Sequence, residues 1–180
     1  MLNEIDVLRE VISRLDGAGW PYMLTGSLAM TLHALPRMTR DIDLVVELEP
    51  ADAGRVVRAF EKDYYVPEDA VTHAIQRRSM FNLLHLESAI KVDVMVRKSG
   101  EYRQVEFARR WKGKVRDFEV WTVSKEDLIL SKLSWAKESR SEVQLRDVRK
   151  LIASGCDTAY IDSWTDRLGV AELWKECQHE

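Results

Sequence analysis

Three aspartates in the sequence could form a site for divalent cations. Asp41 and Asp43 flank Ile42 at the start of an apolar, β-branched run, and Asp93 lies inside a second such run at 91–95. Because side chains alternate between the two faces of a strand, Asp41 and Asp43 should project from one face. Asp93 would join them if the two strands are neighbours. Since gathered carboxylates repel one another unless a cation such as Mg²⁺ or Mn²⁺ lies between them, we predict that all three are metal ligands and catalytic residues.

Gly26 and Ser27 could bind phosphate next to this cluster. They follow a strand-like run at 22–25 and precede a helical pattern over 28–35, so they should form a strand-to-helix turn. Glycine lets the backbone approach a phosphate closely, and the free N–H groups at a helix N-terminus attract anions. Two divalent cations beside a triphosphate can promote attack by a hydroxyl group and the departure of pyrophosphate. The pattern therefore points to chemistry on a nucleoside triphosphate.

Each of these signals also has a structural explanation. An Asp-x-Asp pair before an apolar strand is commonly turn or capping chemistry. For the acids, the ordered set of turn, acid pair and third acid favours the metal site. Arg37 and Arg40 flank the acid pair and could bind the nucleotide, but they could equally balance the charge of the carboxylates. Both interpretations of the arginines stay open.

The elements that would position these residues predict an α/β protein. The 180 residues suit one domain, or a compact core with a helical appendage. Apolar periodicity predicts helices over about 2–15, 28–35, 50–64 and 100–110, and strands at 22–25, 41–46, 80–86, 90–96 and 118–123, the last at a sheet edge. Ser124, followed by two acids, predicts the start of a helix, and further helices are expected near 143–153, 160–168 and 170–177. We expect a short mixed β-sheet core over 1–123 and a C-terminal helical segment over 124–180 packed on it.

Composition narrows the class of protein. The formal net charge of -3 and the pI near 5.9 give the whole molecule no electrostatic bias toward nucleic acid or membrane. No secretory signal is predicted at the N-terminus, and no run reaches the length of an apolar membrane span. Cys156 and Cys177 fit reduced thiols in a cytoplasmic protein.

Aromatic and basic residues outside the acid cluster have competing interpretations. The run 109–116 combines arginines and lysines with Trp111, as an RNA-contacting surface would, but a solvated helix end with a buried Trp also explains it. Trp135, Trp164 and Trp174 lie on the C-terminal helical patterns, where we expect core positions.

The ordered motifs resemble the nucleotidyltransferase superfamily of the DNA polymerase β type. They are Gly26-Ser27, Asp41-x-Asp43 and Asp93. The runs 37–43 and 126–133 further resemble minimal bacterial nucleotidyltransferases related to AbiEii-type abortive-infection toxins, and the resemblance covers about residues 5–152. It implies metal-dependent transfer of a nucleoside monophosphate to a hydroxyl acceptor with release of pyrophosphate. It also implies that the chain is the toxin of a toxin–antitoxin system, and that its partner is a cognate antitoxin protein.

The resemblance assigns roles to two later residues as well. It implies that Lys132 contacts the triphosphate and that Arg146-Asp147 contributes to the site. Without it, Lys132 could be a solvated lysine on a helix face, and Asp147 could form an ordinary ion pair. The chain departs from the family pattern at Lys150, where a second acid is common. The acceptor, whether a small molecule, tRNA or protein, is not indicated, and the alternative to an enzyme is a catalytically idle nucleotide-binding or partner-binding module of the same fold.

Overall fold

The structure is a computed structural model, and it describes residues 2–34 and 41–179. The described helices are α1 (Glu4–Ala18), α2 (Gly26–Met30), the 3₁₀ turn η1 (Pro50–Asp52), α3 (Ala53–Phe60), α4 (Glu68–Arg77), α5 (Glu101–Ala108), α6 (Lys125–Ser139), α7 (Glu142–Ala153), α8 (Thr158–Leu168) and α9 (Ala171–His179). The strands are β1 (Tyr22–Thr25), β2 (Ile42–Val46), β3 (Tyr64–Tyr65), β4 (Met80–His85), β5 (Lys91–Val96), β6 (Trp111–Val115) and β7 (Phe118–Thr122). The predicted class, a mixed α/β fold with C-terminal helices, is confirmed.

All the described strands belong to one mixed sheet with the order β3-β4-β5-β2-β1-β7-β6. The β2–β5 and β1–β7 pairs are parallel, and the other neighbours are antiparallel. The consecutive strands β4 and β5 thus form an antiparallel hairpin. Because β2 and β5 are parallel neighbours, their first residues lie at the same edge of the sheet.

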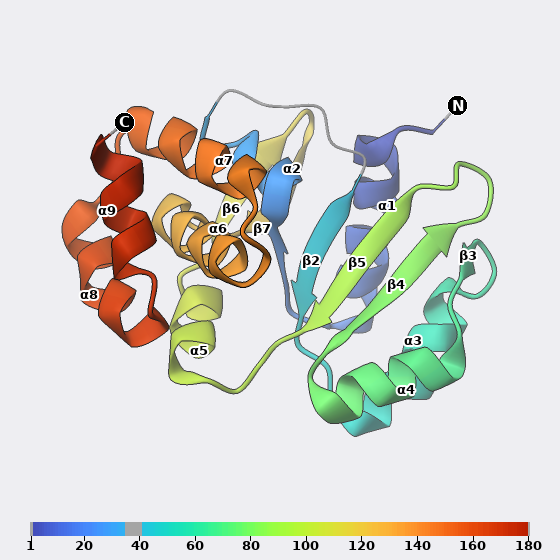
Figure 1. Cartoon of the computed structure of the whole chain (residues 1–180). Helices are drawn as coiled ribbons and strands as arrows, with labels where there is room; N and C mark the ends of the chain where they lie inside the picture. The colour runs from blue at the N-terminus through green and yellow to red at the C-terminus, as the bar shows by residue number, and fades with distance from the viewer. Residues whose placement is uncertain (1, 35–40, 180) are drawn as a thin grey trace.

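The two faces of the sheet differ over β2, β5 and β4. Apolar side chains alternate along these strands and are buried on one face, and α1 lies behind this face in Figure 1. On the opposite face, no helix lies in front of β4 and β5 in Figure 1, and this face carries the acids. The alternation of period two is what separates the core from the polar residues here.

The C-terminal helices are joined to the rest of the chain through the start of α6. The hydroxyl of Ser124 accepts a hydrogen bond from the backbone N–H of Asp127, which confirms the predicted cap. The buried Asp127 carboxylate also accepts hydrogen bonds from Tyr160 of α8 at 2.7 Å and from Tyr102 of α5 at 3.3 Å. One residue thus connects α5, α6 and α8. Within the described part of the chain, every helix falls short of the length or the apolar character that crossing a bilayer demands.

Several predicted elements need correction. The helix expected over 28–35 is the short α2, followed by turns, and the helix expected over 50–64 is divided into η1 and α3. The strands β3 and β6 and the helix α4 were not predicted. Because β6 pairs with β7, the run at 118–123 is an internal strand and not the expected sheet edge. Trp135 is 53% exposed, so it is not the core residue that helical spacing predicted.

Candidate active site

Two of the predicted metal ligands lie side by side on neighbouring strands. In the β2–β5 register, Asp43 is directly opposite Asp93. The row continues on either side of this pair, since Asn82 of β4 is opposite Asp93 and Thr25 of β1 is opposite Asp43. We call these four residues the acid row. Since neighbouring strands are about 4.8 Å apart, the acid row crosses four strands within roughly 15 Å. The sheet therefore brings together residues that are distant in the sequence.

The turn after β1 packs directly against Asp43. Gly26 has a φ of +66°, a left-handed conformation that side chains other than glycine rarely adopt. A Cβ atom at this position would lie 2.1 Å from Oδ2 of Asp43 and 2.7 Å from its Cγ. Glycine is thus required here for two reasons: the backbone is left-handed, and a side chain would clash with the Asp43 carboxylate. Ser27 follows in the first turn of α2 and is buried.

Burial and neighbouring negative charges destabilise the ionised form of the Asp43 carboxyl group. Only 8% of the residue is exposed, and this burial is the main reason why its pKa rises from 3.8 to about 6. The negative charges of Asp93 and Asp41 raise the pKa in the same direction, while Lys132 and Lys91 lower it. The site therefore disfavours the ionised carboxylate until additional positive charge arrives.

Asp93 is held by its neighbours on the same face. Its Oδ1 lies 3.1 Å from Nζ of Lys91 and accepts a hydrogen bond from the amide of Asn82. Asp41 lies just before β2 and is exposed, next to the segment 35–40, for which no placement is described. Arg37 and Arg40, predicted to bind the nucleotide, fall in that segment and lie outside the described residues.

The described acids suit a cation that arrives with its substrate. In the part of the chain described, no group of three or more His, Cys, Asp or Glu side chains is gathered tightly enough to hold a metal ion. Mg²⁺ in nucleotide sites commonly takes one or two carboxylates and completes its shell with water and phosphate oxygens. The Asp43–Asp93 pair, with the raised pKa of Asp43, fits that requirement, and Asp41 is close enough for its charge to act on Asp43.

Lys132 is a buried residue close to these acids. It is 3% exposed, so the alternative of a solvated surface lysine is wrong. Its Nζ lies 2.7 Å from Oδ2 of Asp147 and donates a hydrogen bond of 3.0 Å to Gln144, and both partners belong to α7. Asp147 is likewise buried, and its ion pair is with this neighbouring helix. The charge of Lys132 acts on Asp43, so this residue of α6 lies near the acid row.

Acidic neighbours offset part of the charge of the basic run at 109–116. Arg109 donates to Asp127 at 3.0 Å and stacks on Tyr160, 3.8 Å from the ring centroid. Lys112 pairs with Glu119 across β6 and β7. Trp111 is 41% exposed and belongs to a strand, so the expected helix end with a buried Trp is wrong, and the RNA-contacting surface stays a prediction.

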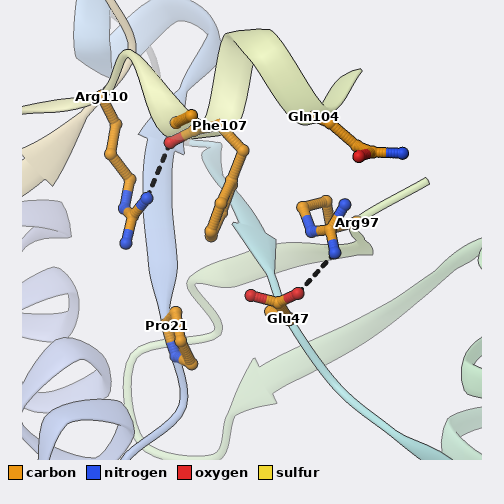
Figure 2. A pocket seen from close by; sticks show the side chains of 7 residues that line it. Pro21, Glu47, Arg97, Gln104, Phe107 and Arg110 are labelled. Carbon is orange, nitrogen blue, oxygen red and sulfur yellow. Dashed lines mark hydrogen bonds and ion pairs between the residues drawn. The ribbon is translucent and has the colours of Figure 1, made fainter. Parts of the chain in front are cut away.

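A cavity of about 280 Å³ lies away from the acids. Figure 2 shows the Arg97–Glu47 ion pair on one side of it and Arg110 on the other, with Phe107 between them. Glu47 follows β2 and Arg97 follows β5, so the cavity is at the opposite edge of the sheet, roughly 13 Å along each strand from the acid row. It is separate from the candidate active site.

Sequence reasoning missed the polar neighbours of the acids. Asn82, Thr25 and Lys91 surround the pair through strand register, and Gln144 joins Lys132 through helix packing. The only signal for Asn82 was its place in the alternating pattern of β4, where a polar residue lies between two exposed apolar ones.

Solved structures of nucleotidyltransferases share this fold. The solution structure of the antibiotic-resistance factor ANT(2'')-Ia has a TM-score of 0.61 and 15% identity, and it covers 96% of both chains. The lincosamide antibiotic adenylyltransferase LnuA with bound lincomycin has a TM-score of 0.56 and 15% identity, covering 82% of this chain and 95% of LnuA. An antigenic nucleotidyltransferase-like protein from Paracoccidioides brasiliensis has a TM-score of 0.57 and 17% identity, covering 96% of this chain and 92% of that protein. At these identities the similarity establishes the fold.

The family is established by the sequence itself. No curated protein matches the chain. The sequence profile of the family described as "Nucleotidyl transferase AbiEii toxin, Type IV TA system" matches residues 17–160, well over half of the chain and all of the acid row. The protein therefore belongs to the AbiEii nucleotidyltransferase family and is a nucleotidyltransferase.

Proposed function

We propose that the protein transfers a nucleoside monophosphate from a nucleoside triphosphate to a hydroxyl acceptor, in a reaction that requires Mg²⁺ or Mn²⁺ and releases pyrophosphate. The observation that carries the proposal is the register of Asp43 against Asp93, with the Gly26 turn packed on the Asp43 carboxylate. The turn that we propose to bind phosphate thus packs against one of a pair of neighbouring carboxylates.

Each residue of the site has a role in this reaction. Asp41, Asp43 and Asp93 would hold the metal ions, which when bound offset the negative charge that develops on the phosphate oxygens. The backbone of Gly26 can approach the β- and γ-phosphates because no side chain intervenes, and the Ser27 hydroxyl would donate to them. Both residues hold the donor in place while the α-phosphorus is attacked.

The acceptor hydroxyl would lie beside Asp93. A carboxylate at this position can orient the hydroxyl and accept its proton. Lys91 and Asn82 both contact Oδ1 of Asp93, so Oδ2 is the oxygen that we expect to accept the proton. The proton leaves on Asp93, the new oxygen–phosphorus bond forms, and pyrophosphate departs toward Gly26.

Lys132 of α6 would contact the triphosphate in addition to Gly26 and Ser27. Its charge already acts on Asp43, and it is oriented by the ion pair with Asp147. A buried lysine that is fixed by a neighbouring carboxylate needs little rearrangement to meet a phosphate oxygen. Arg37 and Arg40 are also proposed to bind the nucleotide, on the basis of their places beside Asp41.

The family and the neighbours suggest the donor and the setting. ANT(2'')-Ia, solved with adenylyl-2''-tobramycin, and LnuA are adenylyltransferases of similar fold, which supports ATP as the donor. The family description supports a role as the toxin of a toxin–antitoxin system, with a cognate antitoxin protein as partner.

The test is transfer of label from each α-³²P nucleoside triphosphate, with Mg²⁺, into host extract that is then separated into small molecules, RNA and protein. We expect one fraction to be labelled by the wild type and by Asp117→Asn, an exposed acid between β6 and β7. Asp43→Asn, Asp93→Asn and excess chelator should abolish labelling. Nucleotide binding without labelling of any fraction would favour the idle nucleotide-binding module, and labelling by Asp43→Asn would disprove the assignment.

A further inference from the structure

The face that carries the acids continues as an exposed apolar surface. On this face β4 presents Met80, Asn82 and Leu84, and β5 presents Lys91, Asp93 and Met95, as their alternating burial and their register show. Met80 is 51% exposed and Leu84 is 39% exposed. Tyr65, the register partner of Leu84 on β3, is 62% exposed. We name this set of residues the β4–β5 face, and Figure 1 shows no helix in front of it.

The direction of the proposed reaction places the acceptor over this surface. An in-line displacement puts the attacking hydroxyl and the departing pyrophosphate on opposite sides of the α-phosphorus. The phosphate-binding turn at Gly26 follows β1, and β1 lies beside β2 on the side away from β5. The hydroxyl must therefore approach from the side of Asp93, and the rest of the acceptor then lies on β5 and β4.

The charges of the β4–β5 face do not suit a polynucleotide. Lys91 is its only cation in the part of the chain described, and its Nζ lies 3.1 Å from Asp93. Binding of single-stranded nucleic acid requires a basic groove that follows the phosphates, in addition to stacking side chains. Tyr65 could stack on a base, but β4 and β5 offer no series of cations along the path that the backbone would take.

The dimensions of the surface suit a small molecule. Met80 and Leu84 are four residues apart on one strand, which corresponds to roughly 13 Å, and β4 to β2 spans about 10 Å. An exposed apolar patch rimmed by polar groups commonly marks a ligand site. Asn82 lies between the two apolar side chains, next to Asp93, where it can donate to or accept from a hydroxyl group.

We propose that the β4–β5 face binds the acceptor, and that the acceptor is a small hydroxyl compound with an apolar side. This inference rests on the proposed function, because it takes the positions of the phosphates and of the attacking hydroxyl from it. Met80 and Leu84 contact the apolar side of the acceptor, and Asn82 positions its hydroxyl groups. These three residues then determine which hydroxyl compounds are used.

The experiment uses n-alkyl glucosides from methyl to hexyl as probes. They are titrated calorimetrically into the full chain with Mg²⁺ and a non-hydrolysable triphosphate analogue. A fully buried methylene raises affinity roughly fourfold, so we expect a gain of about twofold to fourfold per added methylene in the wild type. The double variant Met80→Gln/Leu84→Gln should lose most of this gain. The matched control Met80→Leu/Leu84→Met should keep it, because it exchanges one apolar side chain for another.

The affinity for the triphosphate analogue separates this inference from the proposed function. It should be the same in wild type, double variant and control, because neither substituted position touches the phosphate turn. If wild type fails to bind the analogue with Mg²⁺, the proposed function is refuted, and the glucoside titration without nucleotide still decides whether the face binds apolar compounds.

Three results would overturn the inference. The first is an affinity that does not depend on chain length in the wild type. The second is efficient labelling of total tRNA with a KM that the double variant leaves unchanged, which would identify RNA as the acceptor. The third is a concentration-dependent dimer in sedimentation that the double variant abolishes, because a second copy of the chain would then cover the face.

Discussion

Replacing Asp43 by asparagine should stabilise the metal-free protein at neutral pH. In the folded protein the pKa of Asp43 is raised to about 6 from 3.8, first by burial and then by Asp93 and Asp41. Each pKa unit corresponds to 1.36 kcal/mol, so ionised Asp43 costs about 3 kcal/mol of folding free energy above pH 6. This cost falls as the pH is lowered through the interval from about 6 to 3.8, where the folded protein keeps the proton. The amide of the Asp43→Asn variant carries no charge at any pH, so it should not lower the free energy of unfolding in this way.

Urea unfolding with excess chelator measures this difference. At pH 8 we expect Asp43→Asn to be more stable than wild type by up to about 3 kcal/mol, or roughly 6–12 °C in Tm. At pH 4 the difference should shrink below about 1 kcal/mol. The control Asp117→Asn, at an exposed acid, should stay within about 0.5 kcal/mol of wild type at both pH values. With Mg²⁺ and nucleotide at a hundredfold excess over Kd, wild type should gain about 2.7 kcal/mol and Asp43→Asn much less.

The reasoning would be refuted by either of two results. One is an Asp43→Asn protein that is less stable than wild type at pH 8 without metal. The other is a stability difference that does not change between pH 8 and pH 4, because a difference without pH dependence cannot come from the ionisation of this carboxyl group.

Three further substitutions test other contacts of the site. Gly26→Ala should lower stability by at least about 2 kcal/mol in urea unfolding and should abolish transfer, because the left-handed backbone is strained and the new Cβ displaces Asp43; a stable, active variant would contradict this packing. Lys132→Met should cost about 3–5 kcal/mol in the same assay, because it removes the cation beside buried Asp147, and adding Asp147→Leu should restore most of the stability but not the transfer. If stability is not restored, the pair is not the source of the cost. Asp41→Asn should leave metal-free stability within about 0.5 kcal/mol, because this residue is exposed, while calorimetry should show weaker Mg²⁺–nucleotide binding; unchanged binding would remove Asp41 from the site.

The placement of the acids could be predicted from the sequence because it depends on a short-range rule. Asp43 and Asp93 each alternate with apolar residues, and a strand of period two assigns them to the polar face without any knowledge of the fold. The turn at Gly26 is equally local. That β2 and β5 are neighbours was only an expectation, and the register in the structure supplies it.

The features that sequence reasoning missed depend on partners far along the chain. The strand β3 has two residues, and β6 has Gly113 at its centre, where a glycine weakens the strand signal, so neither is recognisable on its own. Both exist because a neighbouring strand pairs with them. The burial of Lys132 could not be predicted either, because it depends on Asp147 and Gln144 of the following helix.

The parallel pairing of β2 with β5 also has a kinetic consequence. The pair joins Asp43 to Asp93, 50 positions later, and the parallel contact of β1 with β7 joins positions 98 apart. Contacts of such long range slow folding, because the connecting chain must be ordered before the pairing stabilises it. During synthesis at about 5–20 residues per second, Lys132 leaves the ribosome roughly 2–8 s after Asp93. A nascent chain thus carries all three acids for seconds before α6 with Lys132 has been synthesised, so the proposed nucleotide site can be complete only late in synthesis.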